Sequence, residues 1–167
     1  MGMPKALVRE DDGTSWLRRS VAVLRDGGCD PITVVLGARA AEARQLLDGS
    51  VETVVAGDWA EGMGASLRAG LVSLGDAAAC LVSLVDLPDV GADVVRRVVG
   101  LGADPGVLAR AAYDGKPGHP VLIGRDHWAG IVETTVGDRG ARDYLATHGV
   151  RLVECGDLAT GADRDTR

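Results

Sequence analysis

Asp86 stands in the segment VDLPDV, directly after an apolar run that has the composition of a buried strand. Mg²⁺ binds proteins through one or two carboxylates together with substrate phosphates, so a carboxylate at the end of such a strand suits it. The same side chain could instead make a turn or cap a helix, and Asp89 is equally able to cap. Asp86 is the first candidate for a metal ligand.

A glycine loop, AGDWAEGMGASLRAGL, follows an earlier strand-like segment. Gly62 and Gly64 would allow the backbone to approach a ligand closely. Ser66 is expected to open the amphipathic helix that follows, and helix N-termini favour anions and polar ligands. The alternative is a purely structural role, in which the glycine loop ends in a serine that caps the helix. Leu67 stands where a GxGxxG dinucleotide motif would need its last glycine, and no GxxxxGK[ST] motif occurs.

The first residues, MGMPK, combine a glycine, a proline and a lysine in the manner of a phosphate-holding loop. Lys5 and Lys116 are the only lysines beside 16 arginines, and both lie in glycine- and proline-rich segments. Lysine acts as a compact point charge where arginine is a planar fork, so the two are not interchangeable at a tight phosphate site. Gly2 and Lys5 are therefore candidates for contacts with phosphate.

Three further polar segments lie in the second half of the chain. His119, between Gly118 and Pro120, is expected on a loop, where it could donate to a substrate or satisfy backbone carbonyls. Asp138 is expected to cap a helix that begins at Arg139. Arg142 lies on that helix and could bind an anion or be a solvated surface charge. In the tail, Asp163 and Asp165 could face one cleft or belong to a frayed end.

These candidates need a scaffold, and the apolar periodicity supplies one. Helices are expected over 14–25, 39–47, 65–74, 94–99, 126–133 and 139–148, and strands over 32–36, 51–55, 80–85, 106–112 and 150–154, with 120–123 a short strand or a turn. Strands separated by helices indicate an α/β fold, a three-layer αβα arrangement around a mainly parallel, Rossmann-like sheet. Ligands bind beyond the carboxyl ends of such strands. We find no repeat or linker, so residues 1–167 are read as one domain.

The bulk composition excludes several classes of protein. Hydrophobic residues make up 46% of the 167 residues and charged residues 25%, which is typical of a globular chain. A net charge of −6 disfavours a nucleic-acid partner. No apolar run is long enough for a membrane span or a signal peptide, so a cytoplasmic location is expected. The three cysteines form no CxxC motif and are expected to be small buried side chains rather than a disulfide scaffold.

Taken in order, the segments MGxPKAL, EGMGASLRAGL, LVDLPDV, GKPGHPVL, GDRGAR and DRDT resemble the MobA-like NTP transferases, the molybdenum-cofactor nucleotidyltransferases, over nearly the whole chain. GHPVL and GDRGAR look most like the cytidylyltransferase branch. The family's front loop, of the type LAAGxGxRMGxxK, is represented only by its back end at 1–5. The resemblance thus implies that a first strand and the front of the nucleotide loop are missing upstream, which would leave a sheet edge uncovered and favour a homo-oligomer.

The resemblance also implies roles for the candidates: transfer of NMP from an NTP to a phosphorylated acceptor, with release of pyrophosphate. Lys5 would hold the triphosphate together with Gly2, and the segment from Gly62 through Gly64 to Ser66 would contact base and ribose. Asp86 would bind Mg²⁺, aided by Asp165 or, as the weaker alternative, Asp163. On the acceptor side, the resemblance implies contacts from His119, Asp138 and Arg142.

Three functions remain open from the sequence. The leading one is a Mg²⁺-dependent cytidylyl transfer from CTP to molybdopterin. The second is guanylyl transfer from GTP to molybdopterin or to a small phospho-acid. The third is a non-catalytic nucleotide-binding or partner protein that has lost its phosphate loop.

Overall fold

The computed structural model describes residues 3–164, and its helices and strands alternate along the chain as the periodicity predicts. The helices are α1 (Trp16–Asp26), α2 (Ala40–Arg44), α3 (Met63–Ser73), α4 (Ala92–Val99), α5 (Trp128–Thr134) and α6 (Arg142–Thr147). The strands are β1 (Thr33–Leu36), β2 (Glu52–Val55), β3 (Ala79–Val82), β4 (Leu108–Tyr113), β5 (Lys116–Gly124) and β6 (Arg151–Glu154). Short 3-10 helices are η1 (Lys5–Leu7), η2 (Trp59–Glu61), η3 (Arg125–His127) and η4 (Gly137–Arg139).

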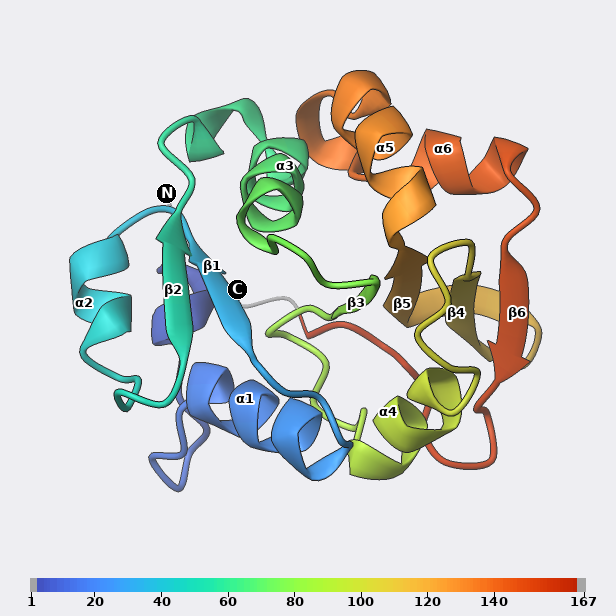
Figure 1. The fold of residues 1–167 in the computed structure, drawn as a ribbon. Helices are drawn as coiled ribbons and strands as arrows, with labels where there is room; N and C mark the ends of the chain where they lie inside the picture. The colour runs from blue at the N-terminus through green and yellow to red at the C-terminus, as the bar shows by residue number, and fades with distance from the viewer. Residues whose placement is uncertain (1–2, 165–167) are drawn as a thin grey trace.

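The strands form a central layer between two layers of helices, so the predicted three-layer α/β fold is confirmed (Figure 1). Helices α3, α5 and α6 lie on one side, where their apolar residues form a cluster with β3 and β5. Helix α4 covers the opposite face of β4 and β5, with α1 beside it. Within residues 3–164, no helix is both long enough and apolar enough to cross a membrane.

The strands belong to two sheets. In the first, β1 pairs with β2 in parallel; in the second, the order is β3-β5-β4-β6. Strand β6 is parallel to β4, whereas β5 runs antiparallel to both of its neighbours. The carboxyl ends of β3, β4 and β6 therefore lie at the same rim as the amino end of β5. In the part of the chain that the structure describes, the edge strands β1, β2, β3 and β6 each have a strand on one side only.

The position of β3 at an edge of the sheet affects its burial. The sequence segment 80–85 predicts a deeply buried strand, yet every residue of β3 is only partly buried, whereas Val121–Ile123 of β5 are buried. A strand with a neighbour on one side only leaves part of its apolar surface uncovered. Of the cysteines, Cys155 is fully buried, Cys29 and Cys80 are partly buried, and all three are free thiols.

Three local predictions are wrong. His119 lies within β5 and not on a loop. The first half of β5 pairs with β4 alone, so its other edge is unpaired there, and an unpaired edge tolerates prolines. Ser66 does not open a helix, because α3 starts three residues earlier, at Met63. Asp138 does not cap a helix from Arg139, because Gly140 has a left-handed φ of 53° and the helix starts again only at 142.

Candidate active site

Lys5 and Asp86, 81 positions apart, form an ion pair at the rim of the sheet. The Nζ–Oδ2 distance is 2.5 Å. Asp86 is buried, with 7% of its side chain exposed, whereas Lys5 is partly open to solvent. A carboxylate so far from water needs a nearby cation, and the ammonium group supplies it. The rim therefore holds a positive group and a hard oxygen ligand side by side.

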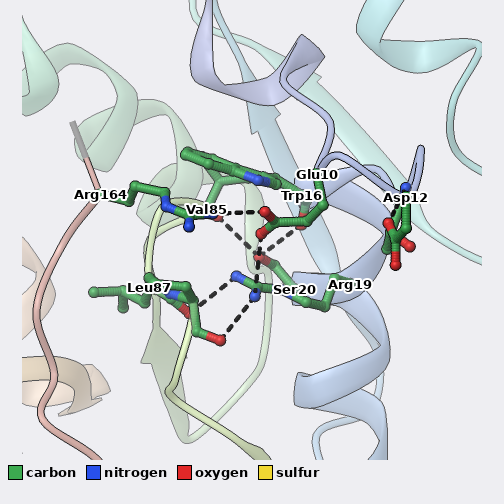
Figure 2. Close-up of polar contacts among 10 residues, drawn as sticks. Glu10, Asp12, Trp16, Arg19, Ser20, Val85, Leu87 and Arg164 are labelled. Atoms are coloured by element: carbon green, nitrogen blue, oxygen red, sulfur yellow. Dashed lines mark hydrogen bonds and ion pairs between the residues drawn. The ribbon is translucent and has the colours of Figure 1, made fainter. Parts of the chain in front are cut away.

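Helix α1 holds the loop that carries Asp86 through its main-chain carbonyls (Figure 2). Arg19 donates from Nη1 to the carbonyl oxygen of Pro88 at 2.7 Å and from Nη2 to that of Leu87 at 3.1 Å. The Ser20 hydroxyl lies 3.4 Å from the carbonyl oxygen of Val85. Because Arg19 and Ser20 are consecutive residues of a regular helix, this loop is tied to a rigid element.

The C-terminal segment reaches the same loop. The backbone N–H of Arg164 donates to the carbonyl oxygen of Asp86 at 2.8 Å, and its guanidinium group lies 2.5 Å from a carboxylate oxygen of Glu10. Glu10 also faces Arg19 at 3.7 Å (Figure 2). The Arg164 guanidinium carbon lies 5.9 Å from the centre of the Trp16 ring. Sequence reasoning missed this network, because nothing local links residues 10, 19 and 164.

The glycines of the 62–64 segment pack against the protein's own backbone. A Cβ atom on Gly62, where φ is 121°, would lie 2.5 Å from an Asp138 carboxylate oxygen; one on Gly64 would lie 2.9 Å from the Gly137 carbonyl oxygen. Asp138 accepts a hydrogen bond from the backbone N–H of Met63 at 3.3 Å. Asp138 therefore binds the N-terminus of α3, and the close approach that the glycines allow is to the 137–138 loop.

Ser66 is the fourth residue of α3 and lies in its first turn. Gly70, one turn further on, approaches Val35 of β1 so closely that a Cβ atom would lie 3.0 Å from its side chain. Residues four apart share one face of a helix, so Ser66 points toward the same sheet. Its hydroxyl has no hydrogen-bond partner among residues 3–164.

His119 and Arg110 occupy the face of the second sheet that α6 covers. Burial is the largest cause that lowers the pKa of His119, to about 4; the Arg110 charge acts in the same direction, and Asp86 opposes it. His119 is therefore neutral at neutral pH and can donate one hydrogen bond. Arg110 donates from Nε to the carbonyl oxygen of Gly118 at 2.9 Å. Sequence reasoning missed Arg110, although an arginine inside the apolar strand LARAAY was a signal.

The remaining predicted site residues are either exposed or outside the described part of the chain. Arg142 is exposed at the start of α6, and Asp163 is exposed beside the Asp86 loop. Gly2 and Asp165 lie outside the described residues. Residues 3–164 contain no group of three or more acidic, histidine or cysteine side chains that could hold a metal. Asp86 still fits Mg²⁺, because this ion takes one carboxylate when substrate phosphates complete its shell.

A rim with these side chains is suited to phosphate chemistry. Lys5 can neutralise a polyphosphate, Asp86 can bind a hard divalent cation, and neutral His119 can orient an oxygen.

Comparisons with known proteins point in the same direction. A family model described as the MobA-like NTP transferase domain matches residues 1–152. Nicotine blue oxidoreductase from Paenarthrobacter nicotinovorans is 34% identical over 174 residues, covering 98% of this chain and 84% of that protein.

Three solved structures have the same fold. Rv0371c from Mycobacterium tuberculosis H37Rv matches with a TM-score of 0.80 and 26% identity over 98% of this chain and 85% of that chain. Its complex with manganese gives a TM-score of 0.79 at 25% identity, over 98% and 88% of the two chains. A nucleotidyl transferase from Methanothermobacter thermautotroptrophicus matches with a TM-score of 0.73 at 25% identity, over 90% and 74%.

Proposed function

The chain belongs to the MobA-like NTP transferase family, and from this membership we propose that it transfers NMP from an NTP to a phosphorylated acceptor and releases pyrophosphate. The proposed nucleotide is CTP and the proposed acceptor is molybdopterin, because GHPVL and GDRGAR resemble the cytidylyltransferase branch. The proposed cofactor is Mg²⁺. The manganese complex of Rv0371c supports a divalent cation on this fold.

The observation that carries this proposal is the contact between Lys5 and Asp86, two residues that the chain separates by 81 positions. Their pairing gives a cation for the triphosphate and a carboxylate for Mg²⁺ at one point of the rim. A bound Mg²⁺ would neutralise charge that develops on the phosphates. Lys5 would bind the β- and γ-phosphates, and Asp86 would hold the metal.

The proposed transfer is a substitution at phosphorus. An oxygen of the acceptor phosphate forms a bond to the α-phosphorus of the NTP, and the bond from that phosphorus to the bridging oxygen breaks, so that pyrophosphate leaves. The acceptor phosphate is already ionised near neutral pH and needs no strong base. His119, with a pKa of about 4, is a weak base and would contribute by donating a hydrogen bond. Positioning and charge neutralisation therefore supply most of the catalysis.

The test is pyrophosphate release in the presence of molybdopterin and Mg²⁺, with CTP, GTP, ATP and UTP in separate reactions. We expect turnover with CTP; turnover with GTP alone would favour the guanylyl alternative. Nucleotide binding without turnover on any NTP would favour a non-catalytic protein.

Replacement of the metal-binding carboxylate tests the site itself. Asp86→Asn should lower the rate of pyrophosphate release by about a thousandfold, because it removes a charge worth several kcal/mol in the transition state. The control Asp76→Asn removes a carboxylate from the exposed surface and should leave the rate unchanged. Full turnover in Asp86→Asn would exclude Asp86 from the mechanism.

A second candidate is a redox reaction on nicotine blue, favoured by the 34% identity with nicotine blue oxidoreductase. It is tested by following the absorbance of nicotine blue with a nicotinamide hydride donor. Bleaching of the dye that persists in Asp86→Asn, without pyrophosphate release from any NTP, would replace the transferase proposal.

A further inference from the structure

Arg110 and Arg142 bring two positive charges to the same face of the second sheet. Arg110 follows Leu108 by two positions on β4 and so shares its face. That face is covered by α6, because Leu108 and Leu145 belong to one apolar cluster. Arg142 begins α6 one turn before Leu145. Burial is the main cause that lowers the pKa of Arg110, and the nearby charge of Arg142 lowers it further.

Neither arginine has a carboxylate partner within residues 3–164, and Arg110 is half-buried. Among residues 3–164 the Arg110 guanidinium group makes one hydrogen bond, from Nε, so its two terminal nitrogens have no acceptor in this part of the chain. Other arginines of the chain are neutralised, such as Arg97 by Asp157 and Arg68 by Asp58. A half-buried positive charge beside a second one is costly unless an anion joins them.

We propose that Arg110 and Arg142 form a phosphate-binding cradle that takes the phosphate monoester of the acceptor; the assignment to the acceptor rests on the proposed function. Guanidinium groups bind phosphate oxygens in pairs, and two forks suit a dianionic group. Arg110 is thereby assigned to the site as a residue that determines the acceptor.

The strand order separates this cradle from the place of the triphosphate. Asp86 follows β3, His119 lies on β5 and Arg110 on β4, and the order of these strands is β3-β5-β4. His119 therefore stands between Asp86 and Arg110, and it responds electrostatically to both. An NTP held by Lys5 and an acceptor held by the cradle would approach each other at His119.

The direct test is a calorimetric titration with inorganic phosphate, which needs no turnover. Arg110→Gln and Arg142→Gln should each weaken phosphate binding by about tenfold, as expected for the loss of a charged hydrogen-bonding group. Lys5→Gln should change it by less than about twofold, which separates the cradle from the triphosphate site. Arg44→Gln, which removes the same charge from the exposed α2, is the control.

The variants also separate binding from folding. Arg110 anchors Gly118, so its loss could disturb β5. The exposed side chain of Arg142 makes no hydrogen bond in the described part of the chain and provides an independent variant. Unchanged phosphate affinity in Arg142→Gln, or a loss confined to Lys5→Gln, would overturn the cradle. If the cradle binds phosphate but no NTP releases pyrophosphate, the proposed function fails while the cradle stands. In an active enzyme, Arg142→Gln should raise KM for the acceptor and leave KM for CTP unchanged.

Discussion

The neutral state of His119 links the stability of the protein to pH. Burial, reinforced by Arg110, lowers the pKa of this imidazole to about 4 against the opposing effect of Asp86, whereas an unfolded histidine titrates near 6.5. Between roughly pH 4 and 6.5 the unfolded chain thus binds more protons than the folded chain, and the free energy of unfolding falls as the pH is lowered. This contribution is complete above about pH 6.5 and is lost progressively below it.

His119→Gln removes the titration and keeps a neutral polar side chain. The wild-type protein should lose about 3 kcal/mol more than the variant between pH 6.5 and 4, from a pKa shift of roughly 2.5 units. The measurement is urea unfolding across this range in EDTA, so that no metal binds Asp86. A ring of His119 that titrates near pH 6.5 in a proton NMR titration, or parallel stability curves, would contradict the result.

The N-terminus of α3 depends on close packing that only glycine allows. Gly62 combines a φ of 121° with contacts to Asp138 and to the backbone of Gly137 that a Cβ atom would violate. Gly62→Ala should therefore destabilise the protein by about 3 kcal/mol, as both strain and overpacking arise. Gly49→Ala is the matched control, because nothing lies within 4 Å of its Cβ position. Equal urea midpoints for the two variants would show that the 137–138 loop can move to accommodate the added methyl group at little cost in stability.

The helices and strands that the sequence predicted correctly are those with a repeated local pattern. Leu17 and Val21 mark the buried face of α1, and the apolar run ending at Leu36 marks β1. The sequence predicts a loop at His119 because glycine and proline are local signals of turns, whereas the pairing of β5 with β4 depends on two segments taken together. The predicted capping role of Asp138 is wrong for a similar reason, because its hydrogen-bond partner, the backbone of Met63, lies 75 positions away in the sequence.

The residues of the candidate site also differ in whether the local sequence could identify them. The motif order singled out Lys5 and Asp86, and the structure places them in contact. Arg110 and the Arg19 network could not be predicted, because their meaning depends on which side chains face them from other elements. A charged residue in a strand can be recognised as unusual from the sequence, but its partners are known only once the strands are ordered.

The division of the strands into two sheets predicts unequal stability across the molecule. A sheet of two strands is marginal by itself, and three of the four residues of β1 are only partly buried. Strand β5, in contrast, has β3 on one side and β4 on the other, and its residues 121–123 are buried. The β1–β2 pair depends on packing from α3, where Gly70 meets Val35, and on the small apolar cluster around Leu17 and Leu36.

Native-state hydrogen exchange should resolve this difference. The amides of residues 34–36 should exchange at least about tenfold faster than those of residues 121–123, because the two-stranded sheet can open without unfolding the four-stranded one. Low urea should leave exchange of 34–36 almost unchanged, as a local opening exposes little surface, while exchange of 121–123 should accelerate strongly. Equal exchange rates with equal urea dependence would mean that both sheets unfold as one unit. The apolar contacts of α3 and α1 would then couple the two sheets, although, within residues 3–164, no hydrogen bonds between strands join them.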